Sequence, residues 1–331
     1  MSDFVVESKI LLITRARLRI GREQIYIIVL FLYNMIKLTF LGTSDAVPSA
    51  ERNHTAILLT YEGENILIDC GEGTQRQFRM LGLNPCKITR ILLTHKHADH
   101  SIGLIGLLKT MELSGYNKTL FIYGPRGIKE FVQNIFRTFG HVENYKIHVE
   151  EVSGKFLETK SWFLEAEKMS HGVVCNAYNF VKKGQIRIDR KKLKKSGLPN
   201  SEILKKLKEG KDISYNGKKY LAKNLTFQED GKKISFILDT EMKKNIVSFA
   251  KNSDLLVCDS SYGSDLKDKA KLHQHLTASQ AGEIAKKSKS KKLILTHISQ
   301  RYEKKKDVIL KEAKKIFKNS HLAHDLQVVE V

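Results

Sequence analysis

Six consecutive residues, His95-Lys96-His97-Ala98-Asp99-His100, hold three imidazoles and one carboxylate. Neutral imidazole nitrogens and carboxylate oxygens are preferred ligands of zinc. Four such groups so close together could not be held in a core unless they were neutralised or paired. We therefore interpret this stretch as a metal-binding motif rather than as a solvated loop that happens to be rich in histidine.

The segments on either side of this motif predict how it is held. Residues 88–93 form an apolar run that is typical of a buried strand, and residues 102–108 are typical of a helix packed on a sheet. The motif then occupies a strand-to-helix turn, where side chains can converge above the end of the strand.

Three further candidate ligands come directly after apolar runs that predict strands: His171, Asp239 and His297. Taken singly, each histidine also fits a structural role, and Asp239 also fits a helix N-cap. Together with the motif they supply enough donors for two adjacent zinc ions that share one carboxylate. The full set of candidate ligands is His95, His97, Asp99, His100, His171, Asp239 and His297.

Strand and helix signals recur along the 331 residues and predict an α/β fold of one large or two smaller domains. We expect strands over residues 36–41, 56–61, 65–69, 88–93, 120–123, 146–152, 162–169, 234–238, 255–258 and 293–295, and helices over residues 128–139, 243–250, 277–287 and 307–317. Polar groups recur at the carboxyl ends of these strands, which is the usual place for chemistry in such sheets.

The composition is strongly basic, with 57 Lys plus Arg against 36 Asp plus Glu and a net charge of +21. This excess favours a polyanionic partner, although a general abundance of lysine would produce the same total. The four cysteines are scattered without a CxxC motif, which predicts reduced thiols in a cytoplasmic protein.

Residues 1–34 combine a basic stretch with an apolar run, as a signal peptide does, but no small-residue cleavage site follows. The uncharged run over residues 24–36 is shorter than the ~20 residues that a membrane-spanning helix needs. We expect residues 1–34, whether or not they are translated, to lie outside the catalytic fold, and we expect no membrane partner. A membrane anchor is the less favoured alternative.

The motif with its preceding threonine, residues 94–100, resembles the signature of the metallo-β-lactamase superfamily. Further blocks, in the same order, resemble the ribonuclease Z family of tRNA 3′-processing endonucleases, so that the resemblance covers residues 35–331. These blocks are Phe40-Leu41-Gly42-Thr43, Asp69-Cys70-Gly71-Glu72-Gly73-Thr74-Gln75, Ser170-His171-Gly172 and Leu295-Thr296-His297-Ile298-Ser299-Gln300-Arg301-Tyr302.

The resemblance implies an α/β (α+β) fold, namely a four-layer αββα metallo-β-lactamase sandwich with a protruding basic arm, assembled as a homodimer. It also implies two Zn²⁺ per subunit. His95, His97 and His171 would hold the first ion; Asp99, His100 and His297 would hold the second; and Asp239 would bridge them.

The activity that the resemblance implies is removal of the 3′ trailer from precursor tRNA, leaving a tRNA 3′-hydroxyl and a 5′-phosphorylated trailer. A hydroxide held by the metals would attack the phosphorus, with Asp99 accepting the proton of the water. His275, paired with Asp259, would protonate the departing oxygen. His273 fits the spacing as well, but the following Leu276-Thr277-Ala278 favours His275.

The chain departs from the family pattern at two places. The family's Pro-x-Lys-x-Arg loop, linked to handling of the CCA end, reads Pro48-Ser49-Ala50-Glu51-Arg52, so rejection of CCA-bearing tRNA stays open. The family's His-Glu-Ala-Thr block reads Cys258-Asp259-Ser260-Ser261, so Asp259 takes the place of the Glu. Arg52 and Arg301 are candidate substrate-binding residues.

Residues 182–211 form a basic insertion with 12 Lys plus Arg against 3 Asp plus Glu. Such a run is usually only a solvated face. In the family, however, an arm at this place clamps the tRNA elbow, commonly with a Gly-Pro step where this chain has Asn200-Ser201. Candidate phosphate contacts are Lys191, Lys192, Lys194, Lys195, Lys205 and Lys206.

Two other functions remain possible on the sequence. One is a general hydrolase of this fold that acts on small phosphodiesters or thioesters, for which a remote basic clamp would have no use. The other is a basic nucleic-acid-binding module with a structural metal, although structural zinc sites are usually closed four-ligand cages.

Overall fold

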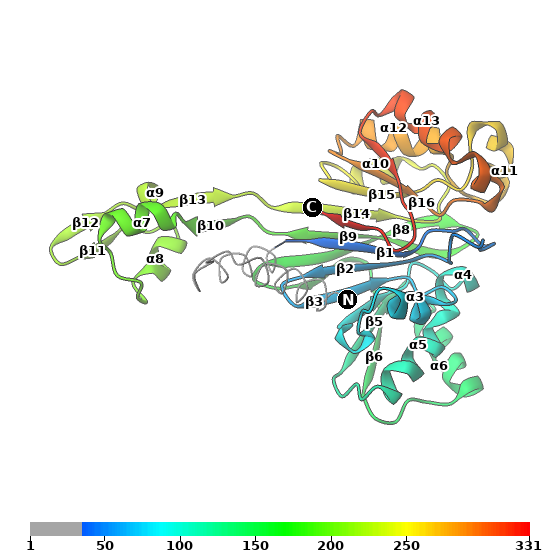
Figure 1. Cartoon of the computed structure of the whole chain (residues 1–331), viewed down its shortest axis with the longest axis horizontal. Coiled ribbons are helices and arrows are strands. Elements are labelled where there is room, and N and C mark those ends of the chain that lie inside the picture. Colours follow the sequence, from blue (N-terminus) through cyan, green and yellow to red (C-terminus); the bar gives the residue numbers. More distant parts are fainter. Residues whose placement is uncertain (1–34) are drawn as a thin grey trace, which may run out of the picture.

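Two seven-stranded β-sheets stack face to face in the computed structural model, which describes residues 35–331 (Figure 1). The expectations for residues 1–34 lie outside the described residues. Within 35–331, no helix combines the length and the apolar character needed to cross a membrane.

The first sheet begins with antiparallel strands and continues with parallel ones. Its order is β18 (Val328–Glu330), β1 (Lys37–Gly42), β2 (Ala56–Tyr61), β3 (Glu64–Ile68), β4 (Arg90–Leu92), β5 (Leu120–Gly124) and β6 (Ile147–Glu151).

The second sheet has the same mixed character, with β14 to β17 parallel and β7, β8 and β9 antiparallel. Its order is β17 (Ser320–Leu322), β16 (Leu293–Thr296), β15 (Leu255–Asp259), β14 (Lys232–Ile237), β9 (Val173–Lys182), β8 (Trp162–His171) and β7 (Gly154–Glu158).

Helices cover the outer face of each sheet, so the layers run helix, sheet, sheet, helix (Figure 1). The first sheet carries α3 (Thr74–Met80), α5 (Gly103–Leu113) and α6 (Ile128–Phe139); the second carries α10 (Lys244–Phe249), α12 (Ala278–Lys287) and α13 (Lys306–Ile316). Two short helices, α4 (Ala98–Ser101) and α11 (Lys267–Leu272), lie at the edge described below. The strands read as nearly continuous apolar runs because both of their faces are covered. The predicted four-layer sandwich is confirmed.

The interior between the sheets is built from large apolar side chains, such as Phe40, Phe180 and Phe236, that are fully buried. Strand β9 also contributes, yet its sequence did not predict a strand because Asn176 and Asn179 interrupt the apolar pattern. Both asparagines are buried with partners: the Asn176 amide donates to the Val152 carbonyl at 2.9 Å, and the Asn179 amide donates to Glu165 at 3.2 Å. Satisfied amides can occupy such positions.

The chain leaves the second sheet after β9 and returns at β14, and the intervening residues project from the sandwich (Figure 1). We call residues 183–231 the arm. It contains β10 (Gln185–Ile188), α7 (Arg190–Ser196), α8 (Leu204–Lys208), β11 (Ile213–Tyr215), β12 (Lys218–Tyr220), α9 (Ala222–Leu225) and β13 (Thr226–Glu229). The insertion expected over residues 182–211 stops short of this return, because β13 pairs with β10 and Leu225 belongs to the arm's own apolar core.

Candidate metal centre

The seven predicted ligands lie together at the edge where β4, β8, β14 and β16 end. His95 and His97 follow β4, Asp99 and His100 belong to α4, and His171 is the last residue of β8. Asp239 and His297 come just after β14 and β16. Parallel strands bring their carboxyl ends to one edge of a sheet, and the sandwich brings the edges of the two sheets together.

The first donor set consists of three imidazoles. His97 Nδ1 lies 3.0 Å from His95 Nε2 and 3.2 Å from His171 Nε2. Oδ2 of Asp239 lies 3.8 Å from His95 Nε2 and 3.4 Å from His171 Nε2. These atoms converge on one point, as the ligands of a single ion must.

The second donor set shares the same Asp239. His100 Nε2 lies 3.1 Å from His297 Nε2, and Asp99 Oδ2 lies 3.3 Å from each of these nitrogens. Oδ2 of Asp239 is 3.2 Å from His100 Nε2, and Oδ1 is 3.3 Å from His297 Nε2. Asp239 therefore lies between the two sets, where a bridging ligand belongs.

The second nitrogen of most of these rings is held by another group. His95 Nδ1 lies 3.0 Å from Thr94 Oγ1, and His100 Nδ1 lies 2.7 Å from Asp69 Oδ2. Such contacts fix ring orientation and tautomer, which metal-binding histidines need.

The other two rings are held in the same way. His171 Nδ1 lies 3.0 Å from the Gln274 carbonyl, and His297 Nδ1 lies 2.8 Å from Ser261 Oγ. Gln274 and Ser261 are distant in sequence from the ligands that they hold, and sequence reasoning gave them no such role.

Asp69 is the buried group that sequence reasoning missed, although it ends a predicted strand and opens one of the family blocks. Besides His100, it accepts hydrogen bonds from the backbone and hydroxyl of Thr94 at 2.7 and 2.8 Å. Two glycines allow its loop to reach the motif. A Cβ on Gly71 would lie 2.3 Å from the Asp99 carbonyl oxygen, and one on Gly103 would lie 1.9 Å from the Gly71 oxygen.

Four residues of the site have left-handed backbones that side chains other than glycine rarely adopt. Their φ angles are 58° at Asp69, 26° at Asp239, 55° at Gln274 and 59° at His297. Such strain costs of order 1–3 kcal/mol per residue and clusters at functional sites. Here it turns each chain segment sharply at or beyond the end of a regular element.

The electrostatics of the site suit a bound cation. Burial and the neighbouring His100 hold the pKa of His95 well below its usual value, which keeps this ring neutral. Burial alone would raise the pKa of Asp239, but His100 and His297 outweigh it and hold that pKa well below normal. Oδ1 of Asp239 is buried without a hydrogen-bond partner among the described residues. Neutral nitrogens, an ionised carboxylate and an orphaned oxygen fit a metal ion.

Beside the donor sets, His275 is paired with the fully buried Asp259. His275 Nδ1 lies 3.0 Å from Asp259 Oδ2, which also accepts from the Leu276 backbone at 3.1 Å. Burial lowers the pKa of His275, but the Asp259 carboxylate outweighs this effect and raises the pKa above its usual value. His273, the alternative from spacing, is exposed.

The predicted substrate-binding residues have different positions. Arg301 is exposed beside the site, 3.2 Å from Ser299 Oγ. Arg52 is only 2 % exposed, and its Nη1 donates to Thr43 and to the Ala323 carbonyl. The structure thus gives Arg52 an internal role, holding its loop, rather than an RNA contact. The six arm lysines named above are all exposed, far from the donor sets.

Comparison with known proteins identifies the family. Ribonuclease Z from Methanothermobacter thermautotrophicus is 38% identical over 299 residues, which cover 90% of this chain and 97% of that protein. Ribonuclease Z from Listeria monocytogenes is 37% identical, covering 89% of this chain and 99% of that protein. The chain belongs to the ribonuclease Z family. It is accordingly a hydrolase, a tRNA-processing endoribonuclease with the metallo-β-lactamase fold.

Solved structures agree with this assignment. The short form of human tRNase Z superposes with a TM-score of 0.65 at 26% identity, covering 88% of this chain and 98% of that one. The metallo-β-lactamase fold protein YhfI from Bacillus subtilis also has a TM-score of 0.65, and at 21% identity it supports the fold alone. A family model described as "Anti-Pycsar protein Apyc1" matches residues 36–142, a minority of the chain.

Proposed function

We propose that this ribonuclease Z family member is a two-zinc endoribonuclease that removes the 3′ trailer from precursor tRNA. Its products are a tRNA with a 3′-hydroxyl and a trailer with a 5′-phosphate. The observation that carries the proposal is the convergence of two donor sets on one shared carboxylate, Asp239.

In this proposal His95, His97 and His171 would hold the first zinc, Asp99, His100 and His297 would hold the second, and Asp239 would be shared by both donor sets. Two zinc ions at such a site supply a nucleophile at neutral pH and charge stabilisation for the phosphoryl oxygens. The protein's part is to fix the ligands, and the outer contacts from Asp69, Thr94, Gln274 and Ser261 support that part.

Protons are moved by one side chain of the second donor set and by one beside the donor sets. Asp99 accepts the proton of the attacking water. His275 gives a proton to the departing 3′-oxygen of the tRNA, since Asp259 holds its Nδ1 and leaves Nε2 to face the substrate. Positioned general acids contribute about 10²–10⁴-fold to a rate.

The arm grips the tRNA away from the cut. We call the edge that carries the seven candidate ligands, at the ends of β4, β8, β14 and β16, the metal edge. Strand β9 has 10 residues between the metal edge and the arm, which at about 3.3 Å per residue places the arm about 30 Å from the chemistry. Lysines at that distance can hold the phosphates of a large RNA but cannot touch a small substrate. We also infer a cytoplasmic homodimer, by likeness to the family.

The deciding experiment is cleavage of a precursor tRNA with mapped ends, compared with hydrolysis of a small chromogenic phosphodiester. We expect a single cut 3′ of the discriminator base and far higher kcat/KM for the tRNA. Equal or better activity on the small substrate would favour the general-hydrolase alternative. Zinc content of about two ions per chain is expected, and full activity with one ion or none would contradict the two-metal scheme.

A further inference from the structure

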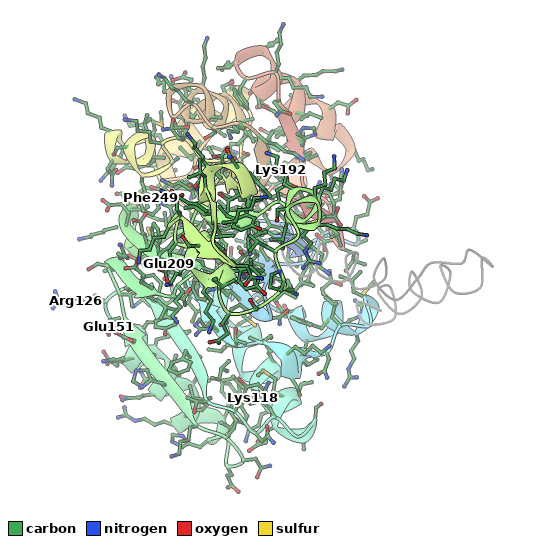
Figure 2. All side chains as sticks on the ribbon, turned by 90° about the vertical axis from the view of Figure 1, so that its left-hand side faces the viewer. Lys118, Arg126, Glu151, Lys192, Glu209 and Phe249 are labelled. Atoms are coloured by element: carbon green, nitrogen blue, oxygen red, sulfur yellow. The ribbon has the colours of Figure 1, made fainter. Side chains whose placement is uncertain are left out.

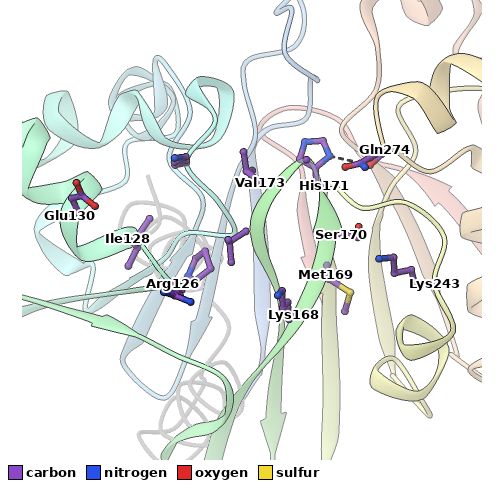
Figure 3. Close-up of a pocket in the computed structure, with 15 residues that line it drawn as sticks. Arg126, Ile128, Glu130, Lys168, Met169, Ser170, His171, Val173, Lys243 and Gln274 are labelled. Carbon is purple, nitrogen blue, oxygen red and sulfur yellow. Dashed lines mark hydrogen bonds between the residues drawn. The ribbon is translucent and has the colours of Figure 1, made fainter.

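A cleft of about 710 Å³ opens beside the metal ligand His171. Figure 3 shows Arg126 and Ile128, which follow β5, on one wall and Lys168 and Ser170 of β8 on the other. His171 lies at one end, where its ring meets the Gln274 backbone. The cleft is therefore continuous with the reaction site, although none of the roles proposed above uses it.

The lining of the cleft is rich in cations without partners. Lys96, Arg126 and Lys168 are exposed and form no ion pair with any residue in the range 35–331. Lys243 lies further along the cleft and pairs with Glu241 at 3.3 Å. Glu130 is the one acidic residue among the residues that line the cleft. A hollow in which one sign of charge predominates concentrates ligands of the opposite charge.

We propose that this cleft binds the phosphodiester backbone of the 3′ trailer. The inference rests on the proposed function, because only a substrate that continues past the cut would fill it. His275 and Asp259 mark the side of the departing 3′-oxygen, which belongs to the tRNA. The cleft is lined by His171 and Arg126 but by neither His275 nor Asp259, so we assign it to the trailer on the other side of the cut.

In this proposal the cleft recognises the charge of the phosphate backbone and not the identity of the bases. Apart from His171, none of the side chains that line it carries an aromatic ring on which a base could stack. Binding of single strands without stacking depends on phosphate contacts and is insensitive to sequence. The enzyme should therefore accept trailers of any sequence and bind longer ones more tightly.

The test compares trailer lengths in variants that each remove one cation. The kcat/KM is measured on two precursor tRNAs, one with a trailer of one nucleotide and one with a trailer of about eight nucleotides. Each substrate is tested with the wild-type protein, with Arg126→Gln and with Lys168→Gln. The matched control is Lys118→Gln, which removes an exposed lysine before β5, at the end of that strand away from Arg126 (Figure 2).

We expect each cleft variant to lose about 3- to 10-fold in kcat/KM on the long trailer, through KM, and less than about twofold on the short one. The slope of log(kcat/KM) against log salt should fall by about 0.7 per removed cation on the long trailer only. A 5′-phosphorylated trailer oligonucleotide should bind Arg126→Gln more weakly than the control, by the same factor.

Equal losses on both trailers would place the tRNA acceptor end in the cleft and overturn the inference. Losses no greater than those of Lys118→Gln would overturn it as well. Failure of the proposed function gives a different result, since the wild-type protein would then cut neither precursor tRNA.

Discussion

The metal edge and the arm present their polar side chains in opposite ways. At the metal edge six of the seven candidate ligands are buried, with His97 the exposed one, and most of the rings are held by a second group, as His100 is held by Asp69 at 2.7 Å. In the arm the lysines of α7 and α8 are exposed, and the fixed part is a small apolar core that includes Leu204, Leu207 and Ile213. Ligand geometry must be fixed to a fraction of an ångström, whereas grip on a polyanion needs only charge at the right distance.

The largest effect should come from removing the carboxylate shared by the two donor sets. Loss of outer contacts typically costs 10–100-fold, so Asp239→Ala should lower kcat/KM by more, about 10³-fold, together with the zinc content. Metal analysis and circular dichroism are measured on the same preparation. A folded variant that keeps both ions and full turnover would contradict the bridging role. Loss of folding together with zinc would instead favour a structural metal.

Removing the arm should affect only the large substrate. Gly184 and Gly231 lie side by side, since a Cβ on Gly231 would be 3.1 Å from Gly184 N, so residues 185–230 can be replaced by a short turn. We expect KM for precursor tRNA to rise by about 100-fold at physiological salt, because many phosphate contacts are lost. Hydrolysis of a small phosphodiester should not change.

A narrower excision of residues 188–210 would cut through the arm's apolar core and would confuse loss of grip with unfolding. The matched control keeps the arm folded and replaces the exposed Lys191, Lys192, Lys194 and Lys195 by Gln. It should reproduce part of the KM effect. If removal of the arm lowers the activity on precursor tRNA and on the small phosphodiester equally, the arm is structural.

An intermediate effect is expected from the carboxylate behind His100. Asp69→Asn replaces an anion that accepts from both His100 and Thr94, and should weaken zinc binding 10- to 100-fold, as measured by competition with a chelator. Glu72→Gln, on the same loop with its side chain 73% exposed, is the control and should bind zinc normally. Identical affinities in the two variants would show that Asp69 does not support the site.

The last prediction concerns the proton donor, for which the smallest loss that we require is about tenfold. His275→Ala should keep both metals and the affinity for precursor tRNA but lower kcat at least about tenfold, since a general acid is lost. Asp259→Asn should act in the same direction, and the double variant should be little worse than the worse single one. Unchanged kcat, or zinc loss that matches the loss of activity, would overturn the assignment.

The neighbouring His273 provides the matched control for this experiment. It lies two residues away and is exposed, whereas His275 contacts Asp259. His273→Ala should therefore have no effect on kcat. A loss of kcat in His273→Ala with none in His275→Ala would show that the two histidines had been assigned in the wrong order.

Much of the metal edge could be predicted because its signals are local. His95 to His100 follow an apolar run directly, and His171, Asp239 and His297 each end or follow another. Strands of that kind bring their carboxyl ends to one place in any sheet of this type. Family blocks along residues 35–331 then predicted the four layers, and the comparisons confirm the family.

The arm's extent could not be predicted from its charge. The run of lysines thins out near residue 211, but the chain returns to the sheet only at β14, because the β10–β13 pair must close first. The position of Arg52 could not be predicted from its residue type either. An arginine in this loop suggested RNA binding, but Arg52 is buried against Thr43 and Ala323, which gives it an internal role.

The sequence by itself indicated the candidate ligands, the strand ends that carry them and the basic character of the insertion, because the signal for each ligand or segment lies in the residues next to it in the chain. The tertiary structure alone decided which groups stand behind the ligands: Asp69 behind His100, Gln274 behind His171 and Ser261 behind His297. Those contacts join segments that are distant in sequence, and they form because the segments follow strands that the fold places near each other. Asp69 and His100 come after the paired strands β3 and β4, and Ser261 and His297 come after the paired strands β15 and β16.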